Sequence, residues 1–308
     1  MGNFAWTVVG AAAGVLRLTT TRRDRKAAAV AAERVFPGGL RVVAARTLFP
    51  QTTGSEIVFA VTGDPDAVVR LRTAGGGREP DEAAVRAAVA TGQAAAERWR
   101  TVNSAFAAAG YPVLGMSETL DTPWVTADLT AATLDEILTG LRSCTTSTGV
   151  SSVLIAPPEV ARALPPEPAG LPTLLWATGR RRLAALSGRR PYHRLSYRPD
   201  GTPALGVVRP FHLQQTYEAA AMASAARWLA AELPGAEPVV LLGATPLLPG
   251  RLDRVKGYVV FRDAGDTPGS YGDHALLVTT DLDGALTGEP TVLRDRRQGT
   301  GRLDLPAL

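Results

Sequence analysis

The sequence predicts an α+β protein made of two related units, each a mostly antiparallel sheet packed by a long helix. The first observation is a weak internal repeat, in which hairpin patterns around Asp64-Pro65-Asp66 and Pro199-Asp200-Gly201 each precede a long helical pattern. Each helical pattern also contains an Arg-Trp pair, Arg98-Trp99 and Arg227-Trp228. Finally, strands and helices do not alternate regularly along the chain, which disfavours a doubly wound parallel sheet.

The chain length and the distribution of proline suggest where the units begin and end. A chain of 308 residues fits two domains at about 100–200 residues each. We expect a first α+β unit with an N-terminal helix over residues 1–155 and a second α+β unit over 171–308. Residues 156–170 are rich in proline, which interrupts regular structure, and they form the predicted linker.

The first half begins with an alanine-rich helical pattern over residues 24–36. It ends at Phe36-Pro37-Gly38-Gly39, because Pro cannot continue a helix and Gly permits a reversal of the chain. A strand is expected over 40–49. Residues 56–61 and 67–73 are rich in β-branched side chains and flank a short turn, so they predict a hairpin.

The segment Thr73–Arg78 contains three consecutive glycines and is expected to be a flexible link. It lacks the terminal Gly-Lys-Ser/Thr of a phosphate-binding P-loop. The helix after it starts near Pro80 and carries an apolar stripe, which predicts that one side faces a sheet and that Trp99 is a core residue. The stripe consists of Val85, Val89, Gly92, Ala96, Trp99, Val102 and Phe106.

Two strands, over 111–116 and 124–129, and a short helix over 134–143 are expected to complete the first half. The pattern Thr133-Leu134-Asp135-Glu136 predicts a capping box at the start of that helix. The second half is expected to contain a strand over 171–177, a hairpin of 194–198 and 202–209, a helix over 212–232, and strands over 239–242, 256–262 and 274–280.

The N-terminal stretch Phe4–Leu18 is apolar but shorter than the ~20 residues of a membrane span, and Arg17 interrupts it. A secretory signal has Lys or Arg before its apolar stretch, and here no Lys or Arg precedes Phe4. We expect a terminal helix that covers the core. The alternative is peripheral membrane contact through residues 4–18, with Arg22–Lys26 on the cytoplasmic side. The expected location is therefore cytoplasmic, with the inner face of the membrane as the alternative.

The net charge of +4 and the pI near 9.6 come from 31 arginines and only two lysines. With the high alanine content, this composition resembles that of proteins from GC-rich actinobacteria and implies nothing about activity. A nucleic-acid-binding protein would concentrate its charge on one face. Most of the arginines are scattered among Asp and Glu, so nucleic-acid binding is the less favoured alternative.

One stretch does concentrate positive charge, and it carries the functional prediction. We expect a non-catalytic binding or scaffold protein that contacts a protein partner or an anionic surface through this stretch. The alternative is an ordinary solvated loop and strand edge. The predicted contact residues are Arg180, Arg181, Arg182, Arg189, Arg190, His193, Arg194 and Arg198.

A second candidate is a metal-dependent enzyme that uses Asp263, Asp266, Asp273 and His274, whose oxygen and imidazole groups suit a divalent cation. The spacing of a calcium-binding loop is absent, and Asp and Gly in this stretch are also ordinary turn formers. A third set, Glu118, Asp121 and Asp128 near Trp124, has the residue types of a glycoside hydrolase without a diagnostic spacing.

Catalytic sequence signatures are missing. The chain contains no Gly-x-Ser-x-Gly, His-Glu-x-x-His, Cys-x-x-Cys or Gly-x-Gly-x-x-Gly pattern. Three histidines offer little general-base capacity near neutral pH. The single cysteine, Cys144, cannot form an internal disulfide and is expected to be a small buried apolar residue. No cofactor is expected. A protein without enzymatic activity is favoured over an enzyme.

Overall fold

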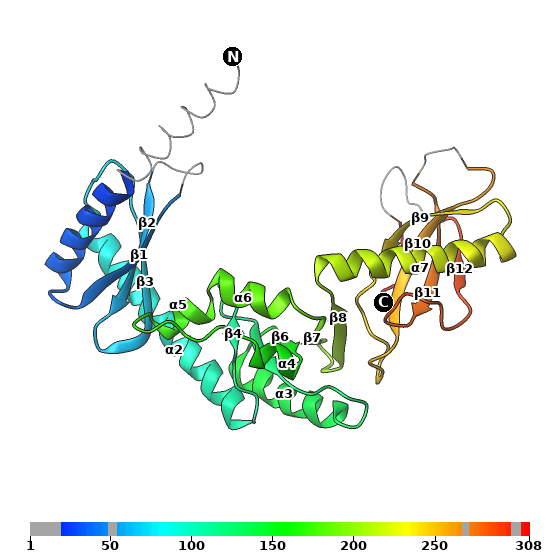
Figure 1. Ribbon diagram of the computed structural model, residues 1–308, viewed down its shortest axis with the longest axis horizontal. Helices are drawn as coiled ribbons and strands as arrows, with labels where there is room; N and C mark the ends of the chain where they lie inside the picture. Colours follow the sequence, from blue (N-terminus) through cyan, green and yellow to red (C-terminus); the bar gives the residue numbers. More distant parts are fainter. Residues whose placement is uncertain (1–19, 49–53, 267–270, 297–302) are drawn as a thin grey trace, which may run out of the picture. The chain divides into compact units, whose positions relative to one another are not determined.

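The computed structural model describes residues 20–48, 54–266, 271–296 and 303–308 (Figure 1). The predicted N-terminal segment Phe4–Leu18 lies outside the described residues. The elements form three sheets with helices packed on them, and all strand pairs except β5–β6 are antiparallel. The predicted α+β class is therefore confirmed.

The chain folds into two compact units. The first contains Met1–Ser104 and Pro165–Gly179, and the second contains Ala105–Leu164 and Arg180–Leu308. Residues 165–170 of the predicted linker thus belong to the first unit. The helix α4 (Pro158–Arg162), also within the predicted linker, belongs to the second unit.

In the first unit, the strands β1 (Leu40–Thr47), β2 (Ser55–Val61) and β3 (Asp64–Arg72) form an antiparallel sheet in that order. The β2–β3 hairpin is the one predicted. A helix over residues 20–35 and the helix α2 (Glu82–Ala108) pack on one face of this sheet. The core between them consists of Ala28, Ala31, Ala32, Ile57, Phe59, Val69, Leu71, Val85 and Val89.

The short helix α5 (Thr173–Ala177) contacts β3 in the first unit. The strand predicted over 171–177 is therefore wrong. Pro172 stands at the N-cap of α5, and the buried Leu174 and Ala177 are three residues apart, which is helical spacing. A short apolar run has no periodicity of its own, so a strand and a buried helical turn look alike in sequence.

In the second unit, five strands form a sheet of order β4-β5-β6-β7-β8, and β6 was not predicted. Their bounds are Gly115–Met116, Pro123–Thr126, Ser152–Ala156, Tyr192–Tyr197 and Pro203–Val208. The predicted strands over 111–116 and 124–129 are shortened to β4 and β5. The β7–β8 hairpin is the one predicted. The helices α4 and α6 (Arg180–Ser187) pack on this sheet through a cluster that includes Trp124, Ala156, Val160 and Leu186.

The parallel strands β5 and β6 are connected by the helix α3 (Leu134–Thr148), as a parallel pair requires a crossover. This helix extends beyond the predicted 134–143 and ends at Gly149, whose φ of 65° is left-handed. The predicted capping box is not formed. Thr133 makes no side-chain cap bond, because its Oγ1 donates instead to the carbonyl oxygen of Asp128 at 2.7 Å.

The remaining sheet of the second unit has the antiparallel order β12-β11-β10-β9 (Figure 1). Its strands are β9 (Glu237–Leu242), β10 (Val255–Arg262), β11 (His274–Thr280) and β12 (Thr291–Leu293). The helix α7 (Phe211–Glu232) packs on it, with Ala225 and Leu229 against Val259, Phe261 and Leu276. The predicted helix over 212–232 and the three predicted strands are confirmed, whereas β12 was not predicted.

The two hairpin-and-helix segments of the internal repeat pack differently. The helix α2 packs on the sheet that contains the hairpin before it, β2–β3. The helix α7 follows the hairpin β7–β8 but packs on the sheet formed by the strands after it. Trp99 is buried, and Trp228 is half-buried against the β10–β11 cluster. The structure therefore does not clearly show two copies of one unit.

Within the described part of the chain, no helix combines the length and the apolar character needed to cross a lipid bilayer.

Candidate functional site

The predicted contact residues all belong to the second unit and occupy α6, the loop after it, and β7 with its C-terminal end. Their charge is concentrated. Residues 180–198 contain seven arginines and no acidic residue, so the rest of the chain holds 26 basic and 29 acidic residues and has a formal charge of −3. We call this stretch the basic segment. The exposed members are Arg180, Arg181, Arg189, Arg190, Arg194 and Arg198.

Three arginines of the basic segment donate hydrogen bonds to main-chain oxygen atoms. Arg182 Nε donates to Leu114 at 2.7 Å, and Arg189 donates from one terminal nitrogen to Ala163 at 2.7 Å. Arg198 donates to Leu308 at 3.4 Å. The carbonyl oxygens of Leu114 and Ala163 carry no net charge, so the bonds to them orient the guanidinium groups of Arg182 and Arg189 without neutralising them.

The exposed arginines of the basic segment differ from many others in the molecule. Arg100, for example, pairs with Asp64 at 3.0 Å and Asp66 at 3.3 Å. Across residues 20–48, 54–266, 271–296 and 303–308, no ion pair includes Arg180, Arg181, Arg189, Arg190 or Arg194. Their positive charge is therefore free to act on a ligand.

Arg194 lies on the same side of its sheet as α6. Tyr192 and Arg194 are two residues apart on β7, so they share one face of the sheet. The ring of Tyr192 packs on Trp124, with the centroids 4.6 Å apart, in the cluster that also holds Leu186 of α6. The structure thus brings Arg194 and the α6 arginines to one face.

His193 lies on the opposite face, the side on which Tyr197 donates a hydrogen bond to Leu138 of α3 at 2.7 Å. Burial, assisted by the nearby positive charge of Arg209, lowers the pKa of His193 to about 4. The imidazole is therefore neutral at pH 7 and adds no charge to the basic segment. This residue was predicted as part of the contact surface, and the structure places it elsewhere.

The acidic set of the metal hypothesis is engaged in ordinary contacts. Arg294 donates a hydrogen bond to Asp263 Oδ2, and His274 Nε2 lies 3.9 Å from the same oxygen. His274 Nδ1 accepts the main-chain N–H of Asp295 at 3.1 Å. Asp266 Oδ2 accepts the main-chain N–H of Asp263 at 2.8 Å, as in a turn. Among the residues that the structure describes, no three His, Cys, Asp or Glu side chains are grouped to hold a metal ion.

Asp121, from the third candidate set, stabilises a tight turn. Its Oδ1 accepts hydrogen bonds from the hydroxyls of Thr119 at 2.8 Å, Ser117 at 2.9 Å and Thr122 at 2.9 Å, and these bonds lower its pKa. The carboxylate is thus stabilised in its ionised form. A general acid needs the opposite shift.

Cys144 is buried, as predicted, and its thiol points to the carbonyl oxygen of Ala105 at 3.8 Å. Burial raises the pKa of this thiol. It is therefore protonated at neutral pH and lacks the thiolate character of a nucleophile.

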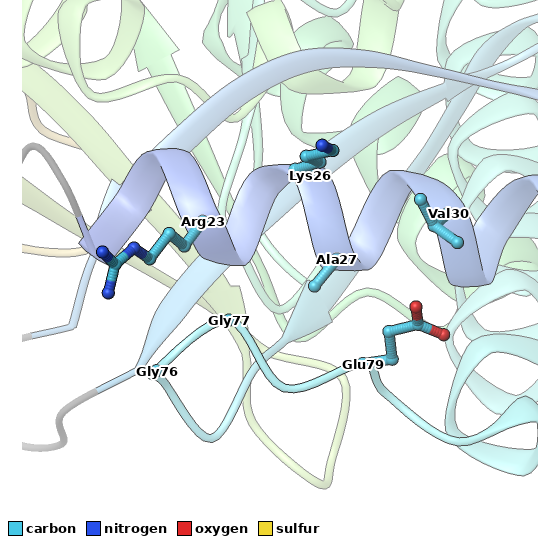
Figure 2. Close-up of a pocket in the computed structure, with 7 residues that line it drawn as sticks. All are labelled: Arg23, Lys26, Ala27, Val30, Gly76, Gly77 and Glu79. Atoms are coloured by element: carbon cyan, nitrogen blue, oxygen red, sulfur yellow. The ribbon is translucent and has the colours of Figure 1, made fainter.

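The first unit contains a pocket that the sequence did not predict (Figure 2). It has a volume of about 290 Å³ and lies between the helix over residues 20–35 and the glycine-rich segment after β3. The segment was expected to be a flexible link because of its consecutive glycines, and it was not predicted to bind phosphate because it lacks the P-loop ending. The pocket is lined by Arg23, Lys26, Ala27, Val30, Gly76, Gly77 and Glu79.

Comparison of the chain with protein-family models, with curated proteins and with solved structures finds no match.

Proposed function

We propose that the protein is a non-catalytic binding or scaffold protein whose second unit contacts an acidic surface of a partner protein through the basic segment. The observation that supports this proposal is the concentration of seven arginines without an acidic residue over residues 180–198. Six of these arginines are exposed. Because the rest of the chain has a net negative formal charge, the basic segment is where the electrostatic attraction of an acidic partner is strongest.

The chemistry of arginine suits this role. A planar guanidinium donates two parallel hydrogen bonds to a carboxylate, which provides both orientation and attraction. Charges at the rim of an interface accelerate encounter and lose strength as salt is added. The arginines of α6 and β7 are held on regular elements, so less conformational entropy is lost when a partner binds.

In this role the protein works in the cytoplasm, and a peripheral contact to the inner face of the membrane through residues 4–18 is the alternative to a terminal helix that covers the core. Flotation of the full-length protein with lipid vesicles tests that contact, and a protein that stays entirely in the soluble fraction removes it.

Binding of a fluorescent polyglutamate peptide to the full-length protein tests the main proposal. The triple variant R189Q/R190Q/R194Q is expected to weaken binding about tenfold or more, and binding is expected to decline steadily with added salt. The control R25Q/R142Q/R227Q removes the same charge at exposed positions outside the basic segment. It is expected to bind nearly as well as the unmodified protein.

Two results overturn the proposal. One is binding that neither salt nor the triple variant changes. The other is a clear preference for anionic vesicles or duplex DNA over the acidic peptide at equal ionic strength, which replaces the protein partner with a lipid surface or a nucleic acid.

A further inference from the structure

The pocket of the first unit has a wall of small residues and two cationic side chains. Arg23 and Lys26 come from one helix, with Ala27 and Val30 on the adjoining turn, whereas Gly76, Gly77 and Glu79 come from the facing segment (Figure 2). In the part of the chain that the structure describes, no ion pair includes Arg23 or Lys26. The pocket is therefore electropositive.

Glu79 is the acidic residue of the pocket wall, and its charge is already compensated. Arg34 donates to Glu79 Oε2 at 2.7 Å. With that pair neutral as a whole, Arg23 and Lys26 supply two positive charges, and the buried carboxylate of Asp24 between them leaves a surplus of one. This surplus attracts a phosphomonoester, which carries a charge of about −1.5 to −2 at neutral pH.

The glycine-rich turn is fixed in place by a buried carboxylate. Asp24 lies between the two cationic residues in sequence and is fully buried. Its Oδ1 accepts the main-chain N–H of Gly77 at 2.8 Å, and its Oδ2 accepts the hydroxyls of Ser55 at 2.8 Å and Thr73 at 3.0 Å. The wall formed by Gly76 and Gly77 is therefore preorganised against the helix.

The backbone of this turn requires glycine. Gly75, Gly76 and Gly77 have φ values of 91°, 72° and 74°, in the left-handed region that side chains disfavour. A Cβ at Gly77 would also lie 3.1 Å from Cβ of Arg23. The N–H of Gly77 is donated to Asp24, and the absence of side chains at Gly76 and Gly77 lets a ligand approach the backbone.

We propose that this pocket binds a phosphate group, carried by a small phosphorylated molecule or by a lipid headgroup. Its volume of about 290 Å³ is at the low end of small-molecule sites, which suits a phosphate and a short attached group. Arg23 supplies a guanidinium, Lys26 an ammonium, and the glycine turn a backbone surface. This site is in the first unit, so it is independent of the basic segment in the second.

Titration of the full-length protein with inorganic phosphate, followed by calorimetry at low ionic strength, tests the site. Saturable binding at one site is expected, with acetate binding much more weakly. R23Q and K26Q are each expected to weaken phosphate binding about tenfold. The matched control is R25Q, an exposed arginine of the same helix that does not line the pocket, and it is expected to leave binding unchanged.

A variant that is expected to strengthen binding serves as a second test, because misfolding could only weaken it. E79Q removes the negative charge of the pocket wall and is expected to strengthen phosphate binding several-fold, because Arg34 then adds to the positive field. The basic-segment variant R189Q/R190Q/R194Q is expected to bind phosphate normally, which separates this inference from the proposed function.

Two further probes distinguish the sources of the phosphate. Glycerol 3-phosphate represents a small molecule, and vesicles containing phosphatidic acid represent a lipid headgroup. Stronger binding of either one than of inorganic phosphate, with the same loss in R23Q and K26Q, supports the site and identifies the source. The proposal is overturned if inorganic phosphate does not bind saturably, or if R25Q weakens binding as much as R23Q and K26Q.

Discussion

The carboxylate of Asp24 accepts the main-chain N–H of Gly77 at 2.8 Å, although 53 positions separate the two residues in the chain. Its other oxygen accepts the hydroxyls of Ser55 and Thr73. One buried side chain thus joins the helix over residues 20–35, the start of β2 and the turn after β3. A buried carboxylate is tolerated only when its hydrogen-bonding capacity is met, and here three donors meet it.

D24A is expected to reduce the free energy of unfolding by about 3 kcal/mol, because three buried donors lose their acceptor. Urea denaturation followed by circular dichroism measures the change. The control D81A removes an exposed carboxylate that accepts one main-chain N–H, from Ala84 at 2.6 Å. Its expected cost is about 1 kcal/mol. Equal costs for the two variants would show that the Asp24 network contributes nothing beyond a cap bond.

The environment of Glu56 leads us to expect that the first unit loses stability in acid. It is buried on β2, where Arg46 and Arg70 approach at 2.9 Å and 3.3 Å. Burial acts to raise its pKa, but the hydrogen bonds and charges of Arg46 and Arg70 outweigh it and lower the pKa below the ordinary 4.5. The stabilisation is therefore present above pH 4.5 and is lost as the pH falls through the lower folded-state pKa.

E56Q is accordingly expected to cost about 1–2 kcal/mol at pH 7. Urea denaturation at a series of pH values measures the difference between the variant and the unmodified protein. That difference should shrink steadily below pH 4.5. A difference that is constant down to pH 3 would mean that the charge of Glu56 contributes no stability.

His193 predicts a second pH dependence, at higher pH and in the second unit. Its folded-state pKa is lowered from 6.5 to about 4. Between these values the unfolded chain takes up a proton that the folded chain does not, so stability falls as the pH drops below 6.5. The expected loss between pH 7 and pH 5 is about 2 kcal/mol. H193Q should remove it, whereas H212Q, at an exposed histidine, should retain it.

Tyr217 holds the guanidinium of Arg209 over its ring at 3.8 Å and shares a hydrogen bond with Thr280 at 2.7 Å. Y217F keeps the ring and loses the hydrogen bond, so it is expected to cost about 1 kcal/mol. Y217L also loses the cation–π contact and is expected to cost about 2–3 kcal/mol. Thermal or urea unfolding of both variants measures the difference. If the two cost the same, the contact with Arg209 does not stabilise the fold.

Gly92 brings α2 close to β3. A Cβ at this position would lie 2.5 Å from the carbonyl oxygen of Val68, a backbone atom that cannot rotate away. Helix propensity alone predicts that G92A stabilises by about 1 kcal/mol. We expect a loss of about 2 kcal/mol instead, because the helix must move off the sheet. The control T91A, at the exposed neighbouring position, should change stability by less than about 0.5 kcal/mol. Stabilisation by G92A would contradict this contact.

The sequence by itself determined the elements whose signals are local. The hairpins β2–β3 and β7–β8 were predicted from their short turns, and the first of them also from its β-branched residues. The helices α2 and α7 were predicted because the spacing of their apolar residues is helical. It also located the concentration of arginine over residues 180–198, since charge is a property of composition.

Tertiary structure alone decided how those elements combine. Only packing makes residues 173–177 a helix, and only packing places α7 on the sheet formed by the strands after it. The pocket of the first unit also exists only through tertiary packing, because Asp24 and Gly77 come into contact only after the chain has folded. The apolar periodicity of a segment shows which of its faces is buried, but it does not show which distant segment packs against that face.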